Sequence, residues 1–532
     1  MRLAARLAYL AFTAHMLLAQ SLFPVAGTVV DAVTDQPLRF VRVFVLKSDS
    51  TSRELATFST GEDGRFRFQL PAGKYSLRAD RRGWRTQTFG STGASNFGTA
   101  LIVAPEQNTQ DLKFRLFPPS SISGVVRDGA GEPVAEALVQ LVRSSIVLGR
   151  RTVRTAGWAY TDDLGQYRFG ELSPATYYIS VTAQPWYSKY VFAGMRSLPG
   201  KSTLNGKSDP SFAPAYFPGT SDPREAAPLV LSAGQDAVAD FNLVETSGFT
   251  IAVILEGGAC TLGRLQLSRE GVSGTESLQR VVDVYAGFEA FRAVAPGHYV
   301  LRYSPVRCDQ NLAGMANVDL TSSDQEVTIA LRPRPTISGS VEIEPGASPG
   351  ILRRLMVSAR DDIANRTYSR NIGADGAFTI PSVFPGKYRI SVSGVPGFYA
   401  KHTSVIQGAM SAGLLDIGAD SAQVKITAGS GLATVKGFVQ RDGTSVPAKM
   451  IVLVAADLNP DPAYFRAFKS DLDGSFDFRD VRPGEYCLFA VDDPEFEYAD
   501  PAIVKPFLKA ALHIRADPNS VQEVKLALAN AN

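Results

Sequence analysis

The stretch VFPGKYRISV, residues 383–392, occurs five times in this chain in closely similar form. The other copies are LPAGKYSLRA at 70–79, LSPATYYISV at 172–181, VAPGHYVLRY at 294–303 and VRPGEYCLFA at 481–490. Each copy places a small turn residue before a tyrosine and then alternates apolar and polar residues. A phrase that recurs at intervals of roughly 90 to 120 residues predicts one structural module per copy.

Most copies are preceded by an Asp-Gly turn and an alternating strand, as in TGEDGRFRFQL and SDLDGSFDF. Asp-Gly supplies the positive φ that a tight hairpin needs, and phenylalanines at every second position predict a half-buried strand. The tyrosine after the next turn can bury its ring and donate its hydroxyl to nearby backbone. We therefore expect the tyrosines to be core residues, with copy two open between two candidates: Tyr75, Tyr177 or Tyr178, Tyr299, Tyr388 and Tyr486.

This pattern predicts an all-β protein, a tandem array of about five seven-stranded prealbumin-like or immunoglobulin-like sandwiches. The expected domains are a signal peptide at 1–19 and sandwiches at 20–117, 118–245, 246–333, 334–430 and 431–532, the second with an aromatic insertion at 185–220 and the third divergent. Helical spacing occurs only in DPAIVKPFLKAALHI, from Asp500. A short helix there would cover Cys487 and Phe489, which lie on the outward face of the last tyrosine strand.

The repeats resemble the carboxypeptidase regulatory-like domain, a prealbumin-like sandwich of the wider immunoglobulin-like group. ISGVVRDGAGEPVAEALVQL, the Asp-Gly hairpins and the Pro-Gly-x-Tyr strands carry the resemblance, which covers most of the chain after its first residues. Two stretches, YFPGTSDPREAAPLVLSAGQD and VRPGEYCLFAVDDPEFEYADPAIVKPFL, look like a narrower family of secreted bacterial proteins. The resemblance implies accessory modules and, because related sandwiches are classed as carbohydrate-binding-like, it permits glycan binding.

The N-terminus, MRLAARLAYLAFTAHMLLAQSLF, is typical of a secretory signal peptide, with an N-terminal membrane anchor as the alternative. No later stretch reaches 18 consecutive apolar residues, so no transmembrane segment is expected in the mature chain. Net charge is +2, without blocks of like charge, so no nucleic-acid partner is expected. The predicted location is secreted, periplasmic or at the cell surface.

The chain has three cysteines, and export would allow a disulfide. Cys260 and Cys308 fall in the same repeat and are the natural pair. Cys487 is expected to be a buried thiol beneath the terminal helix.

The chain has four histidines, too few and too scattered for a zinc peptidase site. One lies in the signal peptide, and none is followed at three residues by glutamate. We therefore predict no catalytic residue, no metal and no cofactor. The acids of SDLDGSF resemble part of a calcium loop, but a hairpin turn explains them better.

Aromatic residues crowd into the insertion, where Trp186, Tyr187 and Tyr190 are the candidate ligand-binding residues. Loops on a rigid scaffold often carry binding function, and flat rings stack on sugar faces. The alternative is that these rings fold back and are buried over their own sandwich. Trp84 is either a cap on sandwich one or an exposed ring.

The sequence thus favours a non-enzymatic secreted binding or scaffold protein, with polysaccharide as the preferred partner. The alternatives are a structural spacer or adhesin that contacts a cell-surface protein, and an accessory subunit of a secreted hydrolase.

Overall fold

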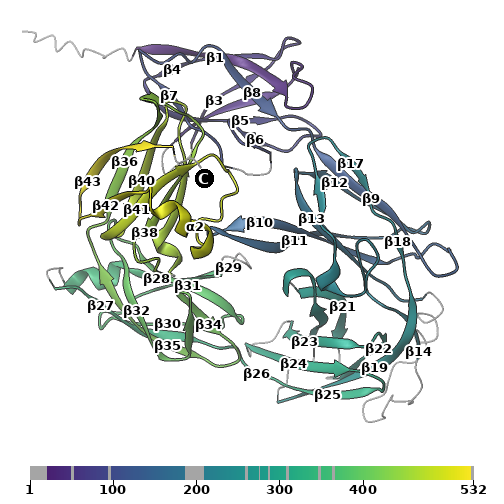
Figure 1. Ribbon diagram of the computed structural model, residues 1–532. Coiled ribbons are helices and arrows are strands. Elements are labelled where there is room, and N and C mark those ends of the chain that lie inside the picture. Colours follow the sequence, from purple (N-terminus) through teal and green to yellow (C-terminus); the bar gives the residue numbers. More distant parts are fainter. Residues whose placement is uncertain are drawn as a thin grey trace, which may run out of the picture.

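The computed structural model describes residues 21–48, 53–93, 97–185, 209–257, 262–274, 276–284, 288–306, 311–345, 349–361, 366–459 and 461–528. Their strands form ten sheets that pair into five sandwiches, here called modules 1 to 5, each closed over its own hydrophobic core. The predicted all-β sandwich array is therefore confirmed, and Figure 1 shows the modules in chain order by colour. The domain limits given above stay a prediction.

Module 1 has a three-stranded and a five-stranded sheet. Its strands are β1 (Leu22–Asp31), β4 (Arg65–Pro71) and β8 (Leu112–Leu116) in the first, and β2 (Arg42–Lys47), β3 (Glu54–Ser59), β5 (Gly73–Asp80), β6 (Gln87–Thr88) and β7 (Leu101–Val103) in the second. In module 2 the first sheet holds β9 (Ser120–Arg127), β12 (Gln166–Leu172), β17 (Asp236–Val238) and β18 (Phe241–Asn242). Its second sheet holds β10 (Leu138–Val147), β11 (Arg150–Tyr160), β13 (Ala175–Thr182), β15 (Ala215–Tyr216) and β16 (Leu229–Leu231).

Module 3 borrows a strand from the insertion of module 2. Its sheets are β14 (Asp209–Phe212), β19 (Glu245–Glu256), β22 (Phe288–Val294) and β25 (Gln325–Ala330), and β20 (Gly263–Glu270), β21 (Glu276–Val284), β23 (Gly297–Pro305), β24 (Leu312–Leu320) and β26 (Arg332–Pro333). Because β14 pairs with β19, part of the insertion is a strand that joins the two modules rather than a free loop.

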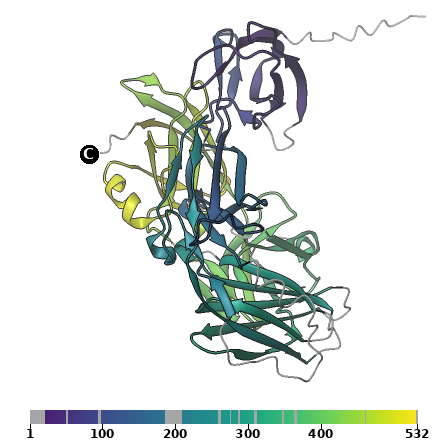
Figure 2. The same cartoon turned by 90° about the vertical axis from the view of Figure 1, so that its right-hand side faces the viewer.

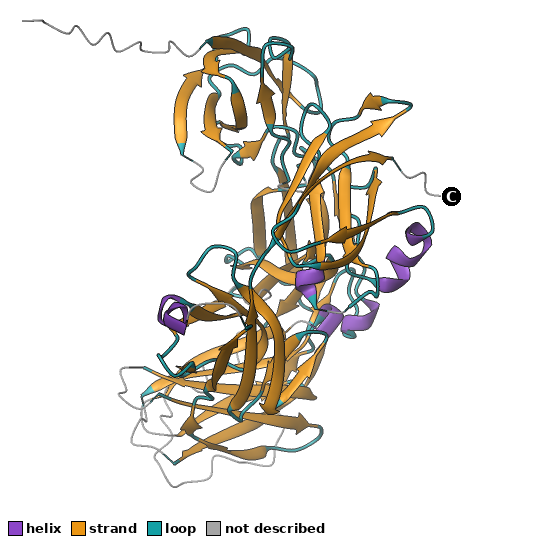
Figure 3. Cartoon of the chain, turned by 90° about the vertical axis from the view of Figure 1, so that its left-hand side faces the viewer, coloured by secondary structure: helices purple, strands orange, loops and turns teal. Residues whose placement is uncertain are grey.

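Modules 4 and 5 repeat the same plan. Module 4 holds β27 (Ile337–Ile343), β30 (Ala377–Ile380), β32 (Tyr399–Gln407) and β35 (Ala422–Gly429) in one sheet, and β28 (Met356–Asp361), β29 (Arg366–Asn371), β31 (Gly386–Ser393), β33 (Ala409–Ser411) and β34 (Leu414–Ile417) in the other. Module 5 holds β36 (Ala433–Arg441), β37 (Thr444–Ser445), β40 (Ser475–Val481) and β43 (Val521–Ala527), opposite β38 (Met450–Ala455), β39 (Phe465–Lys469), β41 (Gly484–Val491) and β42 (Leu512–Ala516). Short helices are η1 (Pro223–Glu225), η2 (Val272–Gly274), η3 (Pro349–Arg354), η4 (Pro462–Tyr464) and α2 (Pro501–Leu508) (Figure 3).

The first strand of each module lies between the strand that precedes the tyrosine phrase and the last strand, which runs parallel to the first. This arrangement explains the glycine that recurs in these first strands. A Cβ on Gly339 would lie 1.9 Å from the carbonyl oxygen of Val424, and one on Gly437 would lie 1.9 Å from that of Val524. Only glycine permits so close an approach of the two backbones.

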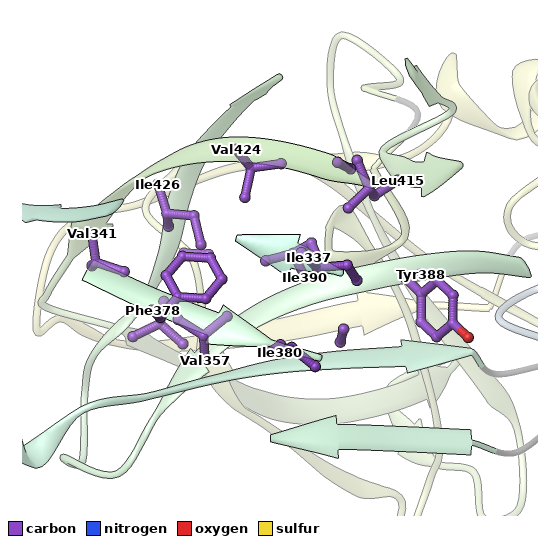
Figure 4. Packing of buried hydrophobic residues seen from close by; sticks show 14 of the residues in the cluster. Ile337, Val341, Val357, Phe378, Ile380, Tyr388, Ile390, Leu415, Val424 and Ile426 are labelled. Atoms are coloured by element: carbon purple, nitrogen blue, oxygen red, sulfur yellow. The ribbon is translucent and has the colours of Figure 1, made fainter. Parts of the chain in front are cut away.

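The tyrosine phrase forms the central strand of the second sheet in every module, and its tyrosine is buried. Each hydroxyl donates to the backbone carbonyl four residues earlier: Tyr75 to Pro71, Tyr177 to Ser173, Tyr299 to Ala295, Tyr388 to Phe384 and Tyr486 to Arg482, at 2.6–2.9 Å. Copy two therefore uses Tyr177. Figure 4 shows Tyr388 and Ile390 facing residues of the opposite sheet in module 4.

The predicted terminal helix is present as α2, capped by Asp500, whose carboxylate accepts the Ala502 N–H at 2.9 Å. Phe507 stacks on Phe489 with ring centroids 5.4 Å apart, and Cys487 is buried in the same cluster. The helix therefore covers the outward face of β41, as expected from the apolar residues there.

The five modules do not form a straight string, because module 5 returns to contact modules 1, 2 and 4 (Figure 1). Figure 2 shows module 1 at one end of the molecule and modules 3 and 4 toward the other. We call the three contact regions of module 5 the clasp. None of the described helices is long and apolar enough to cross a membrane.

Candidate functional site

The candidate residues Trp186, Tyr187 and Tyr190 lie outside the described residues, so their role stays a prediction. Where the insertion becomes described again, its aromatic residues are core. Tyr216 is fully buried, and Phe217 packs edge-to-face on Phe241 with centroids 6.4 Å apart.

The remaining candidates from the sequence are the three cysteines and Trp84. Cys260 and Cys308 also lie outside the described residues, and their pairing stays a prediction. Cys487 is buried, and burial raises the pKa of its thiol. Trp84 is half-buried against the core of module 1, under the guanidinium of Arg81, and so acts as a cap.

The three histidines after the N-terminal segment lie far apart on the surface: His298 on β23, His402 on β32 and His513 on β42. Within the described ranges, no group of three or more His, Cys, Asp or Glu side chains is placed to hold a metal ion. The acids of SDLDGSF form a hairpin turn, in which Asp471 accepts the N–H of Gly474 through its carbonyl at 2.9 Å. Asp471 also serves the clasp, described below.

A cavity of about 1630 Å³ lies where modules 2, 3 and 4 meet, and we call it the arginine cavity. One wall is the hairpin β10–β11 of module 2. A second is formed by β23, β24 and the linker 332–335, and a third by β29 and the turn at Phe384.

The lining of this cavity is strongly basic. Among the described residues its lining includes six arginines and no aspartate or glutamate: Arg151, Arg154, Arg302, Arg332, Arg334 and Arg366. Neighbouring guanidinium groups repel one another, and a bound anion reduces that repulsion. Such a lining therefore favours anionic occupants.

The arginines nearest the linker are held by an aromatic ring rather than by acids. The guanidinium of Arg334 lies 4.3 Å from the centroid of Phe384, and that of Arg366 lies 4.9 Å from the same centroid. Stacking of this kind orients a guanidinium while leaving its edge N–H groups available for an acceptor. The turn that carries Phe384 is the start of the tyrosine phrase, so the fold's repeat itself places this ring.

Arg151 is the exception, because its charge is already paired. Its Nε lies 2.8 Å from Glu497 of module 5, and Glu495 lies 3.7 Å away. The hydrogen bond to Glu497 raises the pKa of Arg151. This arginine therefore ties the tip of β10–β11 to module 5, where Gly149 also accepts the N–H of Ala499 at 2.9 Å.

The outward face of β11, which contributes to the cavity wall, also carries an exposed aromatic pair. Trp158 is 67% exposed and Tyr160 is 65% exposed. Trp158 pairs with Gln140, and Gln140 donates to Thr155 at 3.1 Å, so these three residues share one face of the sheet. Thr155 lines the arginine cavity. Two large rings thus stand side by side on the same strand face that forms a cavity wall.

The clasp fixes the modules that build this site. In module 1, Lys74 forms an ion pair with Asp471, and the N–H of Leu472 donates to Ala100 at 3.0 Å. In module 4, the ring of Tyr399 lies 5.5 Å from the guanidinium of Arg482, which pairs with Asp461 at 2.8 Å. Together with the contact to β10–β11, these interactions hold the array closed.

The sequence model of the carboxypeptidase regulatory-like domain matches residues 24–116 and 121–203. These two regions, which make up about a third of the chain, are similar to that domain. They correspond to module 1 and to most of module 2, and so one of them supplies β10, β11 and the exposed aromatic pair. No curated protein matches the chain.

Among solved structures, the Bacillus anthracis TIE protein is 10% identical, with 77% of this chain and 76% of that chain covered and a TM-score of 0.17. A Streptococcal ancillary pilin is 13% identical over 59% of this chain and 100% of its own, with a TM-score of 0.16. GBS52, the minor pilin of Streptococcus agalactiae, is 12% identical, with 42% of this chain and 96% of that chain covered and a TM-score of 0.22. With TM-scores this low, none of these likenesses bears on function.

Sequence reasoning missed Trp158 and Tyr160, which lie in the second region that matches the carboxypeptidase regulatory-like domain. In GWAYT the small residues Gly157 and Ala159 alternate with the two rings. Large rings are usually assigned to the core. Here Ala159 packs toward the core and the rings face outward, because the opposing inward residues Val139 and Leu141 already fill it. The small residue at every second position was the available signal.

Proposed function

We propose that this protein is a non-catalytic extracytoplasmic scaffold that binds polysaccharide along the outward face of β11 and in the arginine cavity. The observation that carries the proposal is the exposed pair Trp158 and Tyr160, which lies on the strand face that also contributes Thr155 to the cavity wall. A flat partner that covers exposed rings of this size removes their apolar surface from water, which is favourable. Sugar rings present such flat apolar faces to aromatic side chains.

The clasp supports a binding scaffold over a spacer. A spacer needs length, and a module that folds back on modules 1 and 2 shortens the array. A composite site needs its walls at fixed distances, and contacts such as Arg151 with Glu497 and Lys74 with Asp471 supply that constraint.

Export and the lack of catalysis are part of the same proposal. The N-terminal segment has the charge and length of a signal peptide. The histidines of the described modules lie on separate strands, each without a second histidine beside it to complete a zinc site. Carboxypeptidase regulatory-like domains also act as accessories to other activities.

The test is a screen of the mature protein against immobilised neutral and acidic polysaccharides, followed by titration of the best binder. Trp158→Ala should weaken binding about tenfold through lost ring stacking. The control is Phe438→Ala, which removes an exposed ring from a different module and should leave affinity unchanged. Wild-type protein that binds none of the polysaccharides, or equal affinity of Trp158→Ala and wild type, would refute the proposal.

Thermal melts of the same variants separate binding from folding. Because Trp158 is exposed, its replacement should change the free energy of unfolding by less than about 0.5 kcal/mol.

A further inference from the structure

We infer that the arginine cavity selects anionic polysaccharide, a chain of uronate or sulfated sugars, over neutral polysaccharide. This inference rests on the proposed function and adds the charge of the ligand to it. Its basis is three arginines that face the cavity and form no ion pair among the described residues, Arg332, Arg334 and Arg366.

Three of these arginines are uncompensated. Arg332, Arg334 and Arg366 make no ion pair with any carboxylate among the described residues. Asp361 lies opposite Arg366 in the register of β28 and β29, but its side chain is buried and does not line the cavity. Elsewhere in the chain arginines commonly find acids, as Arg482 does with Asp461. Within the part of the chain that the structure describes, the positive charge of Arg332, Arg334 and Arg366 is therefore not neutralised by an ion pair.

Arg334 also carries an unsatisfied donor. Its Nε is shielded from solvent and has no hydrogen-bond acceptor among the described residues. A shielded donor without a partner costs free energy, and a carboxylate or sulfate oxygen would remove that cost. The planar face of this guanidinium is occupied by Phe384, so the acceptor must approach along the edge of the group.

The size and surroundings of the cavity favour a chain over a small anion. Small-molecule sites occupy about 300–1000 Å³, and this cavity of about 1630 Å³ exceeds that range. Thr155, which lines the cavity, also lies on the same strand face as Trp158 and Tyr160, which would stack on further units of the same chain. A polymer that alternates flat rings with negative groups matches both parts, whereas an acidic peptide matches only the arginines.

The linker between modules 3 and 4 fixes the positions of Arg332 and Arg334. The segment 331–336 reads LRPRPT, and each proline restricts its own backbone and that of the residue before it. The strand β26 pairs with β24 through Arg332 and Pro333, so the linker is also tied to the edge of module 3. Arg332 and Arg334 are therefore presented on a stiff connection between modules 3 and 4.

The experiment compares polygalacturonate with the same polymer after full methyl esterification, which removes the charge and keeps the sugar backbone. Wild-type protein should bind polygalacturonate about tenfold or more tightly than the ester, and the preference should shrink at high salt. Dextran sulfate and dextran form a second pair, which separates sulfate from carboxylate as the favoured group.

The decisive variant is Arg332→Gln with Arg334→Gln, and the matched control is Arg353→Gln with Arg354→Gln on η3, outside the cavity. Both lose two positive charges. The cavity variant should lose the preference for the charged polymer and keep its affinity for the ester, whereas the control should behave as wild type.

The outcomes separate the two proposals. If binding depends on Trp158 but the protein binds polygalacturonate and its methyl ester equally tightly, the inference is overturned and the proposed function stands. If polyglutamate binds as tightly as polygalacturonate and depends on the same arginines, the cavity is a site for acidic protein and the glycan assignment fails. If both double variants lose the preference equally, the effect is one of net charge and the cavity is not the site.

Discussion

The Lys74 ammonium of module 1 lies 2.5 Å from the carboxylate of Asp471 in module 5, although almost four hundred residues separate them in the chain. Asp471 sits in the Asp-Gly hairpin of its module, and its side chain is only 3% exposed. The same turn places Lys469, which donates to the carbonyl of Gly90 in module 1. A turn needed for folding one module thus doubles as the contact that closes the array.

The pH dependence of stability tests this contact. Burial raises the pKa of Asp471 above its ordinary value of 3.8, despite the opposing effect of Lys74. Between 3.8 and the raised pKa, the folded protein keeps a proton that the unfolded chain has released. The contribution of Asp471 to the free energy of unfolding should therefore fall as pH rises through that window.

Urea unfolding of wild type and Asp471→Asn at a series of pH values measures this contribution as a difference. The difference, wild type minus variant, should decrease with rising pH. A difference that increases with pH would mean that pairing with Lys74 outweighs burial.

The tyrosine hydrogen bonds can be tested within one strand. Tyr177→Phe removes the donor to the carbonyl of Ser173 and should lower the free energy of unfolding by about 1–2 kcal/mol. Tyr178 is adjacent, and its hydroxyl makes no hydrogen bond among the described residues, so Tyr178→Phe should cost less than about 0.5 kcal/mol. Equal costs in a denaturant melt would remove the distinction between the two tyrosines.

In module 4 the backbone of the first strand approaches the parallel last strand closely, so one added methyl group on the first strand should lower the free energy of unfolding strongly. Gly339→Ala would place a Cβ 1.9 Å from the carbonyl oxygen of Val424, so the two strands must separate. We expect a loss of about 3 kcal/mol or more in the free energy of unfolding. Gly350→Ala in the same module has open space around the new methyl and should be nearly neutral. A stable Gly339→Ala protein would argue against the parallel pairing of β27 with β35.

Thiol titration tests the cysteine predictions. In the denatured, unreduced protein, a bond between Cys260 and Cys308 would leave one reactive thiol, that of Cys487. In the folded protein that thiol should react slowly, because it is buried and its pKa is raised. A count of three thiols after denaturation without reductant would exclude the disulfide.

Local patterns were sufficient to predict the sandwiches, the core tyrosines and the terminal helix. Alternation around Tyr388 and the Asp-Gly turns act within one module, so they can be read from a short window of sequence. The arginine cavity could not be found in that way, because Arg151, Arg334 and Arg366 come from three modules and meet only when the array closes. The closing contact of Lys74 with Asp471 likewise leaves no periodic signal, because charged residues at hairpins are normally solvent-exposed.

The measurement that tests the central claim most directly is the titration of wild-type protein with polygalacturonate and with its methyl ester, at low and at high salt. The account predicts saturable binding that is tighter for the charged polymer, weakens with salt, and is reduced by Trp158→Ala for both polymers. Absence of binding to either polymer or to dextran sulfate, or binding that is unaffected by both Trp158→Ala and the Arg332→Gln, Arg334→Gln double variant, would contradict it.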